Sequence, residues 1–199
     1  MTVYENTQRR RSIRRFSPQP VGDSLLDKCV DAARMAPSGR NVQASEFVTV
    51  NTPELLRGMF GNIGGSIKLP PEKGGPAPGN EPKAYTIILI NKEREGDATR
   101  RNVSTFDAGM AAENLILTAF EEGLGCCPLL MFNKDGITSL LNIPERYDIA
   151  LVIAMGYPAE SPVAEIAEGA VDVTVDKDLV RHVPKRKLDD VIHRNGFQG

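Results

Sequence analysis

Residues 107–122 read DAGMAAENLILTAFEE and form the longest stretch of the chain with a helical pattern. Apolar side chains occupy most of the circumference of this helix: Met110, Ala111, Leu115, Ile116, Leu117, Ala119 and Phe120. A helix of this kind is buried on more than one side. We therefore expect it to cross the protein core or a subunit interface. Gly123 follows directly, as is common where a helix ends.

Four apolar runs on either side of this helix predict the strands of one sheet. The run 84–91 is apolar without alternation, which is typical of a central strand covered on both faces. The runs 46–51, 126–132 and 149–155 are the other candidates. Because helices and strands follow one another without regular strand–helix–strand units, we predict an α+β sandwich around one central sheet.

Further helices are expected near the N-terminus. Residues 3–15 predict a first helix that carries a basic cluster in its C-terminal half. Residues 25–35 predict a second helix with one apolar face, formed by Leu26, Cys29, Val30 and Ala33. Thr52 and Pro53 would begin a short third helix, because proline suits the first helical position.

Two segments lack such patterns. Residues 61–82 contain six glycines and five prolines, so we expect a loop without regular structure, either a lid or an excursion without a role. Residues 160–199 are poorer in apolar side chains and predict an extended C-terminal arm. The 199 residues are therefore expected to form a single domain, residues 1–199, with these two appendages.

The composition excludes several classes of protein. The net charge of −2 gives no support for general nucleic-acid binding, so that any basic site must be local. No run of 18 apolar residues predicts a membrane span. The first residues lack the apolar core of a signal peptide, which predicts a cytoplasmic location.

Three cysteines do not make a disulfide framework. Cys126 and Cys127 are expected to be small apolar side chains of a buried segment, the alternative being a redox pair. With His182 and His193 as the only histidines and no Cys-x-x-Cys, a zinc site would lack ligands at workable spacing.

The basic cluster RRRSIRRF at 9–16 contains a candidate phosphate site. On a helix, Arg10 and Arg14 would share a face with Arg11 beside them, and guanidinium groups together with the Ser12 hydroxyl match phosphate oxygens. The alternatives are a solvated basic face and a nucleic-acid arm, although no aromatic residues are interleaved.

The turn PSGRNVQ at 37–43 offers polar groups and a close backbone approach. Such a turn suits a flat polar ligand such as a flavin, or simply ends a helix. No Gly-x-Gly-x-x-Gly motif follows a strand and no P-loop occurs, so a phosphate would be held by side chains.

Taken in order, these segments resemble the FMN-dependent nitroreductase family. The matching segments are RRSIRRF at 10–16, APSGRNVQ at 36–43, the helix and turn at 107–125, AMGYP at 154–158 and KRKLD at 185–189, with Val191 and His193 beyond.

The resemblance implies an intertwined homodimer with two FMN sites at the interface and a mostly antiparallel, mixed central sheet flanked by helices. It assigns to the ribityl phosphate the residues Arg10, Arg11, Ser12, Arg14, Lys185 and Lys187. It implies that the other subunit contributes Pro37, Ser38, Gly39, Asn41 and Gln43 to the site. Against the isoalloxazine ring it places Pro128, Leu129 and Leu130.

The implied activity is transfer of hydride from NAD(P)H through FMN to an electron-poor acceptor such as a nitroaromatic or a quinone. The resemblance leaves open whether NADH or NADPH is the donor. No catalytic side chain is required, and Arg40, Lys68 and Lys73 are candidates for a positive charge near the flavin N1. Ala44-Ser45 and Leu130-Met131 depart from the family pattern. Other flavin chemistry, such as dehalogenation or flavin breakdown, and a non-catalytic FMN-binding protein therefore remain alternatives.

Overall fold

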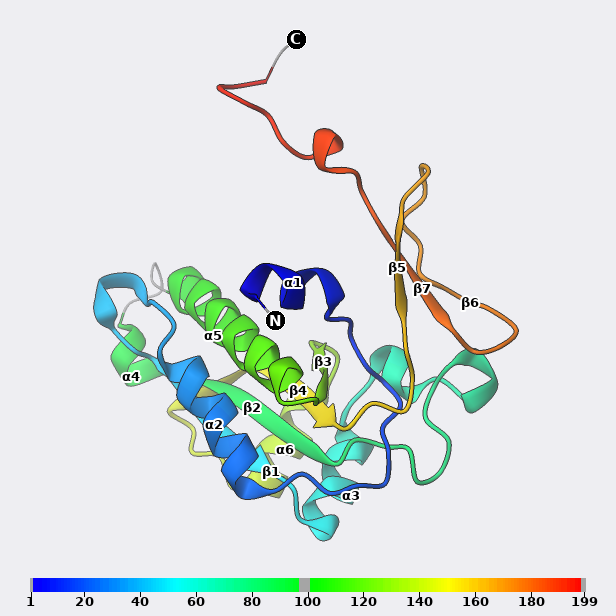
Figure 1. Cartoon of the computed structure of the whole chain (residues 1–199). Helices are drawn as coiled ribbons and strands as arrows, with labels where there is room; N and C mark the ends of the chain where they lie inside the picture. Colours follow the sequence, from blue (N-terminus) through cyan, green and yellow to red (C-terminus); the bar gives the residue numbers. More distant parts are fainter. Residues whose placement is uncertain (1, 97–100, 198–199) are drawn as a thin grey trace.

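The computed structural model describes residues 2–96 and 101–197 and has a four-stranded sheet at its centre (Figure 1). The strand order is β1-β2-β4-β3, and all three neighbouring pairs are antiparallel. The strands are β1 (Ser45–Val50), β2 (Ala84–Asn91), β3 (Gly125–Leu129) and β4 (Tyr147–Gly156). The predicted α+β class, with a mostly antiparallel sheet flanked by helices, is confirmed.

Helices cover both faces of this sheet. α2 (Asp23–Arg34) and α5 (Arg101–Glu121) pack on one face, and α3 (Pro53–Asn62) and α6 (Lys134–Leu141) pack on the other (Figure 1). Side chains of β2 alternate between the two cores: Ile87 and Leu89 face α3 and α6, whereas Ile88 faces α2 and α5. This double burial explains why β2 is apolar without alternation.

Helix α5 is the longer of the two helices in the layer that it forms with α2. It begins before the predicted residue 107 and ends at Glu121, and Gly123 follows with a φ of 82°. Its alanines allow close packing on α2 and the sheet, because Ala108, Ala111, Ala112 and Ala119 are all buried. In contrast, Val103, Phe106 and Met110 are exposed at helical spacing, with Phe106 73% exposed.

The first helix is shorter than predicted. α1 (Val3–Arg9) begins with a capping box between Thr2 and Glu5. The prediction of helix through residue 15 is wrong, because residues beyond α1 run along the edge of β3, where Ser12 forms a parallel bridge with Cys126. This extended course buries Ile13 and Phe16 in the core.

The next helices along the chain were predicted in part. α3 begins at Pro53 after Thr52, as predicted, and runs for ten residues. α6 was not predicted; Asn133 caps it by accepting a hydrogen bond from the Gly136 N–H at 3.2 Å. A further short helix is α4 (Lys92–Glu95).

Residues 61–82 hold more local structure than their composition predicts. They contain two 3₁₀ helices, η2 (Gly65–Lys68) and η3 (Pro71–Lys73). Ile67 is fully buried in the core between α3 and the sheet. The expectation that this segment lacks regular structure was therefore wrong, since the buried side chains of Ile63 and Ile67 and short-range hydrogen bonds organise it.

The C-terminal residues form a small second sheet in the order β5-β7-β6. Its strands are β5 (Val163–Ile166), β6 (Thr174–Val175) and β7 (Arg181–Lys185). Beyond β7 the chain, with η5 (Leu188–Asp190), extends away from the rest of the molecule (Figure 1). Within 2–96 and 101–197, no helix combines the length and apolar character needed to cross a membrane.

Candidate functional site

A small cationic cavity, here the anion cavity, lies where the N-terminal basic segment meets the second sheet. Its volume is about 80 Å³. The lining residues are Arg10, Arg11, Ser12, Arg14, Val173, Arg181, Val183 and Lys185. Five of the predicted phosphate residues are thus brought together, from segments far apart in the sequence.

The lining carries more positive than negative charge. Five of the eight lining residues are Arg or Lys, and the lining described above includes no Asp or Glu. Arg10 Nε lies 3.6 Å from Glu113 Oε1, on the neighbouring helix α5. The buried carboxylate of Glu160 contacts Arg15 Nε at 3.2 Å and accepts from the Arg14 backbone N–H. These two carboxylates leave an excess of cations that a bound anion would balance.

Three of the guanidinium groups also lack hydrogen-bond partners at one atom. The Nε atoms of Arg10, Arg11 and Arg181 are buried and have no hydrogen-bond partner within the part of the chain that the structure describes, although Arg10 Nε lies at ion-pair distance from Glu113. Burial, reinforced by nearby arginines, lowers the pKa of Arg11 and of Arg181, yet guanidinium remains charged at neutral pH. Buried donors of this kind normally have acceptors, and phosphate oxygens fit this need.

The geometry of the basic segment differs from the helical arrangement predicted for it. In an extended chain, alternate residues point to the same side, which places Arg10, Ser12 and Arg14 together. Arg14 Nε donates to Ser66 Oγ at 2.6 Å, which fixes this side chain against the 61–82 segment. Alternation along the extended segment therefore groups Arg10, Ser12 and Arg14, and Arg11 lines the cavity as well.

Strand β7 supplies the other side of the cavity. Its alternate residues Arg181, Val183 and Lys185 all line it. Lys187 does not, because the strand ends at Lys185 and the chain turns away toward η5. Arg181 was missed in the sequence; its spacing of four residues from Lys185, which puts both on one side of a strand, could have revealed it.

The turn at 37–43 is locally strained. Arg40, Asn41 and Gln43 all have φ between 52° and 56°, which non-glycine residues rarely adopt. The Gly39 N–H donates to both carboxylate oxygens of Asp107, at 3.2 and 3.1 Å. Asp107 is buried at the site, and sequence analysis did not single it out.

This turn does not reach the anion cavity of its own chain. It lies at the beginning of α5, whereas the basic segment is tied to β3, which follows the end of α5 (Figure 1). Pro37, Ser38 and Gln43 instead line a separate cavity of about 350 Å³ together with Asp107. Within one chain, then, the two predicted halves of the site are apart.

The predicted ring-contacting residues lie at the edge of the main sheet. Pro128 is exposed and Leu129 is buried in the core, whereas Leu130 is 79% exposed just beyond β3. Gly64, in the 61–82 segment, donates its N–H to Met131 O at 2.7 Å. This edge and the anion cavity are thus both adjacent to the same loop.

The three side chains considered for a charge near a flavin do not line the anion cavity. Lys68 Nζ donates to Phe60 O at 3.0 Å and lies 3.7 Å above the Phe60 ring. Arg40 and Lys73 are exposed on short 3₁₀ helices, η1 (Gly39–Asn41) and η3. Cys126 and Cys127 are buried and unpaired, as predicted, and desolvation raises the pKa of both thiols.

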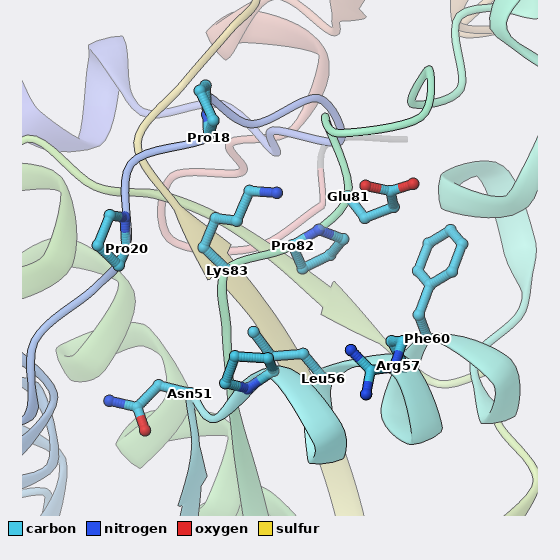
Figure 2. Close-up of a pocket in the computed structure, with 10 residues that line it drawn as sticks. Pro18, Pro20, Asn51, Leu56, Arg57, Phe60, Glu81, Pro82 and Lys83 are labelled. Carbon is cyan, nitrogen blue, oxygen red and sulfur yellow. The ribbon is translucent and has the colours of Figure 1, made fainter.

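A larger groove of about 480 Å³ lies elsewhere, on the α3 side. Figure 2 shows Leu56, Arg57 and Phe60 of α3 facing the prolines at 18, 20 and 82 across this space. None of the residues predicted for the site lines it.

Comparison with known proteins identifies relatives over most of the chain. The model of the nitroreductase family matches residues 7–157. A protein of Methanothermobacter thermautotrophicus, provisionally named NADH dehydrogenase/NAD(P)H nitroreductase, is 29% identical over 171 residues, covering 81% of this chain and 80% of its own.

Solved structures show the same fold. An FMN-dependent nitroreductase of Clostridium difficile R20291 superimposes with a TM-score of 0.67 at 25% identity, over 96% of this chain and 98% of its own. Nitroreductase A of Vibrio parahaemolyticus superimposes with a TM-score of 0.73 at 20% identity, over 100% and 78%.

Proposed function

Because the chain belongs to the nitroreductase family, we propose that it is an FMN-dependent oxidoreductase that uses NAD(P)H to reduce an electron-poor acceptor. Relatives named as NAD(P)H nitroreductases support the enzyme class. The observation that carries the cofactor assignment is the anion cavity, with its excess of cations and its three buried Nε atoms that lack a hydrogen-bond partner among the described residues. A nitroaromatic or a quinone is the acceptor class that we propose.

The residues of the anion cavity fit the phosphate of FMN. Arg10, Arg11, Arg14 and Arg181 present guanidinium donors to one small volume, and Ser12 and Lys185 complete it. Charge-assisted hydrogen bonds to a phosphate dianion would satisfy the buried donors and offset the mutual repulsion of the arginines. We do not include Lys187, because its strand ends before it reaches the cavity.

FMN, when bound, supplies hydride acceptance and donation, and the chain supplies position and a water-poor surface. Leu130 and Met131 are exposed directly after β3 and offer an apolar surface for a flat ring. The side chains of this chain need move no proton for hydride transfer, so we assign no catalytic residue. NAD(P)H would bind above the ring and leave, and the acceptor would then bind at the same position.

We further propose a homodimer, in which the 37–43 turn of one protomer completes the site of the other. The separation of this turn from the anion cavity within one chain supports a contribution in trans. The exposed apolar row Val103, Phe106 and Met110 on α5 offers a surface for a second copy. The projecting C-terminal arm, with Leu188, Val191 and Phe197 exposed, would reach across it.

The test is a visible absorbance spectrum combined with steady-state kinetics. We expect the purified protein to be yellow or to bind added FMN, to elute as a dimer, and to oxidise NADH or NADPH with a nitroaromatic or quinone acceptor. A colourless monomer that takes up no FMN would refute the proposal. Bound FMN without turnover would instead indicate other flavin chemistry or a binding protein.

A further inference from the structure

Arg181 differs from the other cations of the anion cavity because it also contacts the glycine- and proline-rich loop. It is only 5% exposed, and its Nη2 donates to Gly74 O at 3.1 Å. Its Nε is buried and has no hydrogen-bond partner among the described residues. The Arg181 side chain therefore contacts the loop through Nη2 and also lines the anion cavity.

The backbone of the loop is shaped for this contact. Gly74 has a φ of 82°, and a Cβ there would stand 3.1 Å from Arg181 Nη2 and 3.2 Å from Val175 Cγ2. The adjacent Gly75 is even more restricted, since a Cβ would lie 1.6 Å from Leu69 O. Gly75 is thus required by the fold of the loop itself, whereas Gly74 suits both the positive φ and the close approach to Arg181.

A second arginine of the cavity contacts the other end of the same loop. Arg14 Nε donates to Ser66 Oγ at 2.6 Å. The neighbouring Gly64 donates to Met131 O at 2.7 Å, at the edge where we place the flavin ring. The segment 64–75 is therefore fastened at both ends by side chains that also line the anion cavity.

The two contacts link the loop to the charge in the cavity. Without an anion, Arg14 and Arg181 are like charges in a partly desolvated site, where repulsion opposes the geometry that both contacts require. An anion would offset this repulsion and hold both guanidinium groups in place. Whatever orders the arginines then also orders the loop, and the effect is reciprocal.

We propose that Arg181 is a further binding residue for the cofactor phosphate and that it couples phosphate binding to the ordering of residues 64–75. This inference rests on the proposed function, since FMN is the source of the phosphate. It makes the loop a reporter of cofactor binding and places an ordered lid beside the ring only when the site is loaded.

The experiment compares FMN with riboflavin, which lacks only the phosphate. Flavin-free protein is titrated with each, and hydrogen exchange of 64–75 is measured at matched occupancy. We expect FMN to slow exchange in the loop at least several-fold more than riboflavin does. In Arg181→Met, the Kd for FMN should rise about 10- to 100-fold while the Kd for riboflavin changes little, and the FMN-specific protection should be lost.

Two further variants keep the result interpretable. Ser66→Ala removes a loop contact but leaves every cation in place, so it should reduce the FMN-specific protection even if Arg181→Met folds poorly. Arg57→Met is the matched control: this α3 side chain is exposed and pairs only loosely with Glu54, at 3.9 Å. It should leave both Kd values and the loop exchange unchanged.

The outcomes separate the inference from the function on which it rests. If the parent protein binds neither flavin, the proposed function fails. If it binds FMN but Arg181→Met keeps the parental ratio of riboflavin to FMN Kd, Arg181 is not a phosphate ligand. If FMN and riboflavin protect the loop equally, the coupling is refuted although the enzyme class stands.

Discussion

A methyl group on Gly125 would stand 2.5 Å from Ile13 Cγ1 and 2.7 Å from its Cβ. The missing side chain lets the basic segment lie directly on the first residues of β3, where the Ile13 N–H donates to Cys126 O at 2.9 Å. The positions of Arg10, Ser12 and Arg14 therefore depend on a glycine far along the chain.

Replacing that glycine should disturb both stability and cofactor binding. We expect Gly125→Ala to lower the free energy of unfolding by about 1–3 kcal/mol, as overpacking does, and to weaken FMN binding because the arginines shift. Chemical denaturation and FMN titration measure the two effects. Gly61→Ala is the control, since a Cβ there meets nothing within 4 Å and alanine favours helix α3; an equal loss in both variants would contradict the argument.

Arg14 is expected to contribute strongly to binding. Arg14→Ala removes one guanidinium from the anion cavity and the contact with Ser66, so FMN binding should weaken by about 1.5–3 kcal/mol. Isothermal titration with FMN measures this loss. Unchanged affinity would remove the phosphate assignment from this cavity.

Lys185 and Lys187 should differ although only one residue separates them. Lys185 lines the cavity from β7, whereas Lys187 lies beyond the end of the strand. We expect Lys185→Met to raise the Kd for FMN about tenfold, which corresponds to about 1.4 kcal/mol, and Lys187→Met to change it less than about twofold. If the two variants lose affinity equally, the alternation that we assign to β7 does not govern binding.

The second sheet is expected to be pH-sensitive through His182. Its Nδ1 contacts Glu165 of β5 and its Nε2 lies 3.2 Å from Asp176 Oδ2. The bond to Glu165, and then that to Asp176, raises the pKa of His182 above 6.5. This stabilisation is therefore complete below pH 6.5 and is lost as the pH rises through the raised value.

Proton NMR titration of His182, with hydrogen exchange of β5 and β7, tests this dependence. Local stability should fall with rising pH in the parent protein and become flat in His182→Gln over the same range. At the acid end, the Val180 N–H, and then His182, lowers the pKa of Asp176, so that its contribution is lost as the pH falls through the lowered value. A histidine titrating at or below 6.5 would contradict the contacts.

The cysteines should be inert in the folded protein. Burial raises the pKa of Cys29 to about 11 and raises that of Cys126 and Cys127 as well, so few thiolates exist at neutral pH. An aromatic disulfide reagent should therefore label none of the three in native protein at pH 8 and all three after unfolding. Rapid labelling of native protein would revive the redox alternative.

Local signals sufficed for the elements whose environment is uniform along their length. β2 is apolar because it is covered on both faces, and Pro53 marks the start of α3 by its fixed φ. They failed where long-range contacts decide the conformation: the arginine-rich segment has good helical propensity, yet burial of Ile13 and Phe16 holds it extended. α6 was missed although it is amphipathic, because eight residues span only about two turns and give little periodicity to detect.

Residue types and their order were enough to predict the class of fold, the family and the chemistry of the basic segment. Which cations share one cavity depends on the folded chain: Arg181 lines the cavity, Lys187 does not, and the 37–43 turn is separated from the arginines of its own chain. These positions could not be predicted, because strand alternation, a close glycine contact and the direction of the arm fix them, and each depends on chain segments distant in sequence.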